Sequence, residues 1–490
     1  MLGLLQRLAA SGAAYQASSL LAGLLAIFTL PLYTRHLTRA ELGYAETLLT
    51  AIILTSILLR LGIGEALVRF WFDDSDQARR RRLARTVTGI VLGVSTVAAL
   101  VALALAEPIS QALLNTSDAT LVACGVLGLW AFTNLEVAYA LLRVEERRRT
   151  YLAASVSNVL LTVALTVTLV VVLDGGARGY VLGNYVASTV VLLALWAGPL
   201  RGLVGVPVPE TVRTAATGAL LRFGAPTVPA DATVFALNVV DRAYLLRAQS
   251  AAAAGVYSVS VKLATVVIVA VRGFQAAWPP LAYSVTDEAQ AKRLYATVTT
   301  YYVLLTGLIV AALVLLGRWI VDLLTAPAFA DAYQALPWVG LGWALYGLFL
   351  VFVTIAGRAR VTTRTFPAAA AGLVVNVLAL VVLVDPLGIA GAGLALCASY
   401  VVMLAVAHLL TRRLFTVPFE RGRLALLVTV IGGVAAAGEL LLPTSGAAGF
   451  AARLAALAAI PLVLLAARFL RPEERRALRR LAYSRRPPVL

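Results

Sequence analysis

Apolar runs long enough to cross a lipid bilayer recur along the whole chain. A helix needs about 20 apolar residues to span the hydrocarbon core, and we find fourteen such runs, centred near residues 22, 55, 96, 130, 162, 190, 233, 268, 306, 346, 374, 400, 432 and 460. The 490 residues are 61% hydrophobic and 13% charged, with a mean hydropathy of +0.90, which exceeds what a soluble core absorbs. The runs lack the alternating pattern of barrel strands. They therefore predict an all-α polytopic membrane protein with about fourteen transmembrane helices.

The chain also repeats itself at an offset of about 212 residues. The matched pairs include Arg35 with Arg247, Gly43 with Gly255, Arg60 with Arg272, Asp174 with Asp385, and Ser188 with Ser399. A near-constant offset predicts duplication of a whole unit. Each copy holds six helices, an even number, so the two copies are expected to cross the membrane in the same sense around a central cavity. The expected parts are an N-lobe (1–210), a C-lobe (211–422), two extra helices (423–470) and a basic cytoplasmic tail (471–490).

The basic residues predict an orientation. Alternate loops hold most of the Lys and Arg, including RRRR at 79–82 and RRR at 147–149. By the positive-inside rule both termini are expected in the cytoplasm, with the protein in the inner membrane. The net charge of +17 is then mainly a topology signal, and no nucleic-acid partner is predicted. The tail is expected to lie on anionic lipid headgroups, with an unstructured, solvated tail as the alternative.

The sequence gives little support to an enzyme. A membrane-embedded polymerase or ligase acting on lipid-linked sugars is the alternative, and it would need clustered acid and base groups. The polar segments between the apolar runs are too short for a catalytic domain, and the phosphate-binding pattern GxxxxGK[ST] is absent. Glu136 and Asp231 are isolated carboxylates in apolar segments with no histidine nearby in sequence, and His36 and His408 lie far apart. We therefore predict no catalytic residue, no cofactor and no metal site.

Charged residues within the apolar runs are the candidate functional groups. Each costs roughly 2.5 to 3.5 kcal/mol at mid-membrane, so each should face a wet cavity or a partner. We predict that four cations line an anion-binding cavity: Arg60, Arg242, Lys262 and Arg272. The candidates for ion coupling are three carboxylates: Asp231, Glu136 and Asp241. Three alternatives stay open. Arg60 and Arg272 could reach the cytoplasmic surface, Asp241 and Arg242 could lie at the interface, and Lys262 could pair with Asp241.

Several segments resemble a known superfamily, the multidrug, oligosaccharidyl-lipid and polysaccharide exporters, and within it the polysaccharide transporter branch with its Wzx-type flippases. They include FTLPLYTRHLTRAELGYAETL, RLGIGEALVRFWFDD and FGAPTVPADATVFALNVVDRAYLL. The resemblance implies fourteen helices, two six-helix lobes and alternating access that moves an isoprenoid-diphosphate-linked oligosaccharide to the outer leaflet. By that analogy Arg60, Lys262 and Arg272 would meet the diphosphate or acidic sugars. The implied partners are the lipid-linked anionic glycan, membrane lipids, and a polysaccharide polymerase or glycosyltransferases.

A cation-coupled multidrug exporter of the same superfamily is the main alternative. Such exporters usually carry cationic substrates and rely on acidic residues. The first apolar run, residues 11–33, contains no acidic residue, and cations outnumber carboxylates within the membrane segments. This balance favours the flippase over the drug exporter.

Overall fold

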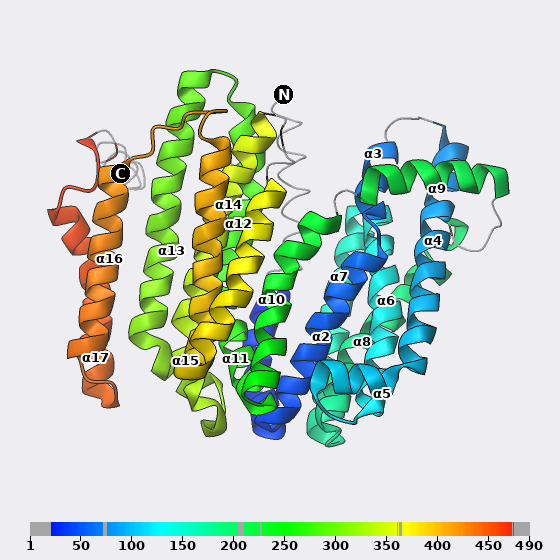
Figure 1. Cartoon of the computed structure of the whole chain (residues 1–490), viewed down its shortest axis with the longest axis horizontal. Helices are drawn as coiled ribbons and strands as arrows, with labels where there is room; N and C mark the ends of the chain where they lie inside the picture. The colour runs from blue at the N-terminus through cyan, green and yellow to red at the C-terminus, as the bar shows by residue number, and fades with distance from the viewer. Residues whose placement is uncertain are drawn as a thin grey trace, which may run out of the picture.

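The fold is taken from a computed structural model of the chain. It describes residues 21–71, 76–203, 210–225, 228–359, 361, 365–472 and 474; for residues 210–216, 230 and 231 it describes the backbone alone. All regular elements in this described part are helices (Figure 1).

The helices fall into two repeats and a C-terminal pair. Residues 21–36 are helical and are followed in the first repeat by α2 (Arg39–Leu59), α3 (Ile63–Trp71), α4 (Gln77–Ala104), α5 (Ala106–Ile109), η1 (Ser110–Leu114), α6 (Ala119–Val144), α7 (Arg148–Val167), η2 (Thr168–Val172), α8 (Gly176–Ala197) and η3 (Arg201–Leu203). After α9 (Glu210–Gly224), the second repeat consists of α10 (Val228–Ala248), α11 (Ala251–Leu263), α12 (Thr265–Ser284), α13 (Glu288–Leu324), η5 (Pro327–Gln334), α14 (Leu336–Arg358) and α15 (Thr365–Thr411). The last two helices are α16 (Arg421–Leu441) and α17 (Gly446–Ala466).

The structure confirms the predicted fold class. Eleven helices in the described residues are long and apolar enough to cross a membrane. One of them, α15, is a hairpin of two crossing arms, because Gly388 adopts a φ of 56° just after Pro386. The arms run antiparallel, since the Ser399 hydroxyl donates to the Gly372 carbonyl at 2.7 Å. Together with α10 and the helical residues 21–36, these elements account for the fourteen predicted runs.

The two repeats meet where α2 crosses α11. Both helices begin with equivalent caps: Thr38 accepts from the Glu41 N–H, and Ser250 accepts from the Ala253 N–H. One turn later Gly43 and Gly255 face the partner helix, and a β-carbon at Gly43 would overlap the Ala251 carbonyl oxygen. A β-carbon at Gly255 would overlap the Arg39 carbonyl in the same way. The predicted repeat pair therefore lies on the pseudo-twofold axis, where only glycine permits so close an approach.

We call this crossing, with the contacts beside it, the seam. An ion pair of 3.7 Å joins Arg39 to Asp331 of η5, and the Ala326 N–H donates to the Thr34 hydroxyl at 3.0 Å. In Figure 1 the repeats lie together at the seam end, and they diverge toward the end that carries α3 and α9. The basic segments gather at that second end, where Arg85 and Arg147 donate to the carbonyls of Gly202 and Pro199.

The two extra helices are held against α13 by buried arginine. Arg453 of α17 is 0% exposed, and its guanidinium donates to the Leu315, Leu442 and Pro443 carbonyls and to Glu439. Arg318 of α13 pairs with the same carboxylate at 3.1 Å. A buried arginine is tolerated only when its donors are satisfied, so this cluster fixes where α16 and α17 lie.

Candidate substrate-binding site

A cavity of about 650 Å³ lies between the two repeats, on the side of the seam toward which the repeats diverge. Its walls come from α2, α6, α7 and α8 of the first repeat and from α10, α11, α12, α14 and α15 of the second. The volume is in the usual range for small-molecule sites. Three cations line it, Arg242, Lys262 and Arg272, and Glu46 is the one carboxylate among the described lining residues.

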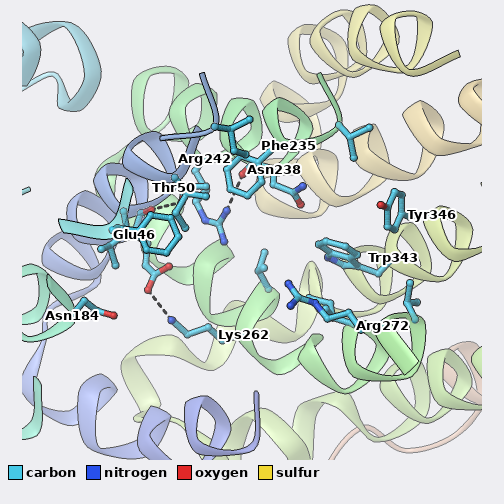
Figure 2. Close-up of a pocket in the computed structure, with 18 of the residues that line it drawn as sticks. Glu46, Thr50, Asn184, Phe235, Asn238, Arg242, Lys262, Arg272, Trp343 and Tyr346 are labelled. Carbon is cyan, nitrogen blue, oxygen red and sulfur yellow. Dashed lines mark hydrogen bonds and ion pairs between the residues drawn. The ribbon is translucent and has the colours of Figure 1, made fainter. Parts of the chain in front are cut away.

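Glu46 and Lys262 form an ion pair that joins the repeats inside the cavity. The Lys262 ammonium lies 2.7 Å from the Glu46 carboxylate, as Figure 2 shows, and the Tyr180 hydroxyl donates to the same oxygen at 2.8 Å. Glu46 is 7% exposed, so its charge needs these partners. At the 212-residue offset, Glu46 corresponds to Ser258 and Lys262 to Thr50. One copy of the duplicated helix thus carries the acid and the other carries the base, at equivalent positions that are one helical turn apart.

Arg242 lies at the centre of the cavity wall, on α10. Its Nε donates to the Ser258 hydroxyl at 3.1 Å and its Nη1 to the Asn238 carbonyl at 2.8 Å. Arg242 is 6% exposed, so its guanidinium is held in place and presents only a small part of its surface to the cavity. Because both partners are neutral, its positive charge still acts on an anion in the cavity.

Arg272 lies on the second-repeat side of the cavity, close to Trp343 and Tyr346 of α14 (Figure 2). Its side chain is exposed, and within the described part of the chain it has no ion-pair partner. An unpaired guanidinium beside a polar cavity is suited to phosphate oxygens. The predicted cations Arg242, Lys262 and Arg272 are therefore brought together.

The structure does not place Arg60 with these cations. Its guanidinium pairs with Glu136 of α6 at 3.3 Å, and its Nε donates to the Ser56 carbonyl, outside the set of residues that line the cavity. Arg60 caps α2, and Leu61 and Gly62 after it adopt φ of 49° and 66°. The helix stops there, whereas Arg272 stands inside the continuous helix α12. The expected equivalence of the two repeated arginines is therefore wrong.

The predicted coupling carboxylates have three different environments. Glu136 is engaged by Arg60, and the Asp231 side chain lies outside the described residues. Asp241 is 1% exposed and points into the second repeat, where the Tyr257 hydroxyl and the Asn376 amide donate to it at 2.9 and 3.1 Å. It is not at the interface and does not pair with Lys262, whose partner is Glu46. The Asn376 Oδ1 is buried and has no hydrogen-bond partner among the described residues.

Sequence reasoning missed Glu46 and the neutral polar lining. Glu46 lies in the apolar run AETLLTAIILTSILL. The free-energy cost of a carboxylate in such a segment could have identified it as a candidate site residue. The amides of the lining, Asn158, Asn184, Asn238 and Gln275, gave no such signal because uncharged polar residues are common in transmembrane helices.

A second hollow, of about 750 Å³, lies on the other face of α14, between α13, α15 and α16. Its lining is almost wholly apolar, with Leu341, Leu348, Leu427 and Ile431 among the contributors, and His408 and Arg421 also line it. This apolar groove has the chemistry of a site for a hydrocarbon chain.

The chain shares its fold with solved membrane transporters. It resembles the lipid II flippase MurJ in an inward closed conformation (TM-score 0.69, 12% identity, covering 92% of this chain and 98% of that one). It is also similar to a multidrug resistance MATE transporter in an inward-facing conformation (0.64, 16%, 84% and 95%). A third similar structure is a transporter from Pyrococcus furiosus described as having a binding pocket of reverse polarity (0.59, 14%, 86% and 95%).

This is the fold of a solved lipid II flippase and of solved transporters of the MOP superfamily, and in this chain a cavity lies between its two repeats. The profile described as polysaccharide biosynthesis protein matches residues 8–282, more than half of the sequence, and the chain belongs to that family. A search of curated proteins finds no significant match.

Proposed function

We propose that this protein moves an isoprenoid-diphosphate-linked oligosaccharide from the inner to the outer leaflet of the cytoplasmic membrane by alternating access. The observation that carries the proposal is the charge balance of the cavity: three cations face one carboxylate, and that carboxylate is already paired with Lys262. A pocket of this kind favours an anion, and guanidinium groups suit the oxygens of a diphosphate. The apolar groove beside α14 supports a cargo with a lipid chain.

The excess of cations over carboxylates in the cavity also argues against a multidrug exporter. A cationic drug needs a carboxylate free to receive it. Glu46 is nearly buried and its oxygens are occupied by the Lys262 ammonium and the Tyr180 hydroxyl. A cation in this cavity would be repelled by Arg242 and Arg272, which line it.

The direction of transport follows from the proposed orientation. With the basic segments in the cytoplasm, the seam closes the outer end and the cavity lies on the cytoplasmic side, ready to receive a lipid made there. The membrane potential, negative inside, favours outward movement of an anion by about 2.3 kcal/mol per charge per 100 mV. A diphosphate carries more than one charge, so the potential can drive export.

The test is transfer of a defined lipid-linked oligosaccharide across reconstituted vesicles, resolved by leaflet. Removing the unpaired cation with Arg272→Gln should reduce transfer about tenfold, the value of one charge-assisted hydrogen bond to phosphate. Arg178→Gln removes a cation that is 54% exposed and paired with Asp118, away from the cavity, and should leave transfer unchanged. Equal transfer by the two variants, or wild-type export of a cationic dye without lipid transfer, would refute the proposal.

We further propose that Asp241 couples transport to a proton or sodium gradient. The Asn376 amide of α15 turns its nitrogen to the Asp241 carboxylate of α10, and its oxygen is buried without a partner among the described residues. Rotation of that amide would bring its oxygen to the carboxylate and form the kind of oxygen pair that a small hard cation prefers. Asp241→Asn should abolish the response of lipid transfer to an imposed ion gradient. Glu136→Gln, which alters the carboxylate paired with Arg60, should preserve the response. A gradient response that survives in Asp241→Asn would remove this role.

A further inference from the structure

The two sides of the cavity differ in chemistry. All three cations come from the second repeat, on α10, α11 and α12. The first repeat contributes, besides Glu46, neutral polar groups on the packed helices α7 and α8: Asn158 and Thr162, and Asn184 and Ser188. Each pair is spaced four residues apart, so each lies on one face of its helix. We call these four side chains the neutral ladder.

The neutral ladder is continuous across the two helices. A β-carbon at Gly183 of α8 would overlap Thr166 of α7, which fixes the register of these antiparallel helices. That register places Thr162 beside Ser188, with Asn184 and Asn158 one turn away in opposite directions. From the helical rise of 1.5 Å per residue, the ladder is roughly 12 Å long. This length exceeds that of a single pyranose ring.

The ladder is not used to join its own helices. Among the described residues, its side-chain hydrogen bonds stay within α8: Asn184 donates to the Tyr180 carbonyl at 2.9 Å, and Ser188 donates to the Asn184 carbonyl. The Asn158 Oδ1 is buried without a hydrogen-bond partner in that same part of the chain. The ladder therefore has hydrogen-bonding capacity left over for a ligand that enters the cavity.

Figure 2 places Asn184 on one side of the cavity and Arg272, Trp343 and Tyr346 on the other, with Lys262 and Arg242 between them. A cargo whose diphosphate lies on the cations would therefore extend its next group toward the ladder. Amides and hydroxyls both donate and accept, and this dual capacity matches the hydroxyl and acetamido groups of sugars. A sugar carboxylate would instead meet Glu46 and no cation from the first repeat.

We propose that the neutral ladder is the saccharide subsite, and that it selects uncharged sugars next to the diphosphate. This inference rests on the proposed function, because it assigns one part of the same cargo to one wall of the cavity. Under this proposal the first repeat binds the sugar and the second repeat binds the diphosphate.

The test compares binding of three lipids to the purified protein: bare isoprenyl diphosphate, the same lipid with an N-acetylhexosamine, and the same lipid with a uronic acid. The wild type should bind the acetamido sugar lipid most tightly. The double variant Thr162→Val, Asn184→Leu should weaken that binding about tenfold, the size of two neutral hydrogen bonds, while bare diphosphate binding changes less than about twofold. Thr168→Val, whose hydroxyl bonds within α7 and η2 away from the ladder, serves as control and should bind all three as wild type does.

The outcomes separate the two proposals. Equal weakening for all three lipids in the double variant, with an unchanged unfolding temperature, would overturn the saccharide subsite while leaving the flippase proposal intact. Tighter wild-type binding of the uronic acid lipid would overturn the preference for uncharged sugars. Wild-type protein that binds none of the three lipids would refute the proposed function itself. The variant Arg272→Gln should weaken all three equally.

Discussion

Replacing Gly255 by leucine is expected to reduce lipid transfer roughly 100-fold. The seam holds Gly255 against the Arg39 backbone with no room for a β-carbon. Overpacking costs about 1–3 kcal/mol, and the upper value lowers the population of the seam-closed state roughly 100-fold. A transporter that cannot close its outer end cannot receive cargo from the cytoplasm. The repeat mate change, Gly43→Leu, should have the same effect, because the Ala251 carbonyl blocks it equally.

The expected cause can be measured directly. A single cysteine at Thr50, in a background without Cys124 and Cys397, reports access to the cavity. In Gly255→Leu this cysteine should react with an impermeant thiol reagent added from outside, whereas in the parent protein it should be protected. Gly433→Leu on α16 is the matched control, since nothing lies within 4 Å of its added β-carbon. Normal transfer by Gly255→Leu would show that the seam opens and closes by some other contact.

Loss of Lys262 should be the second large effect. Lys262→Met leaves the nearly buried Glu46 carboxylate with only the Tyr180 hydroxyl, and breaking one side of a buried pair costs about 3–5 kcal/mol. We expect a lower unfolding temperature and loss of transfer. Adding Glu46→Gln should restore the unfolding temperature, because the carboxylate that lost its partner is then itself neutral. It should not restore transfer, because the cavity has still lost a cation that meets phosphate.

A surface ion pair with the same distance between nitrogen and oxygen serves as the reference for the effect of Lys262→Met on the unfolding temperature. Lys292 lies 2.7 Å from Glu288, the same distance as in the cavity, but Glu288 is 70% exposed. Lys292→Met should therefore change the unfolding temperature little. If the double variant Glu46→Gln, Lys262→Met transfers lipid normally, the ion pair has a structural role alone.

The sequence predicted the features that depend on repetition and hydropathy. In the described residues each of the fourteen apolar runs coincides with a helix or a helical arm, and the matched pair Gly43 and Gly255 lies on the pseudo-twofold axis. A repeat detected at constant offset specifies equivalent positions, and close packing of equivalent helices requires a small residue at the point of contact. The exact lobe boundaries and the cytoplasmic position of the termini stay predictions.

The individual site residues were less predictable, because the position of a residue along a transmembrane helix does not specify which side of that helix its side chain faces. Arg60 and Arg272 are equivalent in sequence, yet α2 ends at Arg60 and the second repeat has its break earlier, at Ala264. The two side chains therefore point to different surroundings. Glu46 was overlooked because its partner, Lys262, is 216 residues away and the pairing depends on how the repeats cross.

The buried Arg453 cluster has a consequence for how this protein can move. Its guanidinium is bonded to carbonyls of α13 and of the turn after α16, and sliding α17 along α13 would strip a charge of several oxygen partners at once. The C-terminal pair should therefore travel with the second repeat as one rigid body during the transport cycle. The flank formed by α16 and α17 would then keep its shape toward the surrounding lipid while it tilts, and relative movement would be confined to the boundary between the two repeats, where α2 packs on α10 and α11.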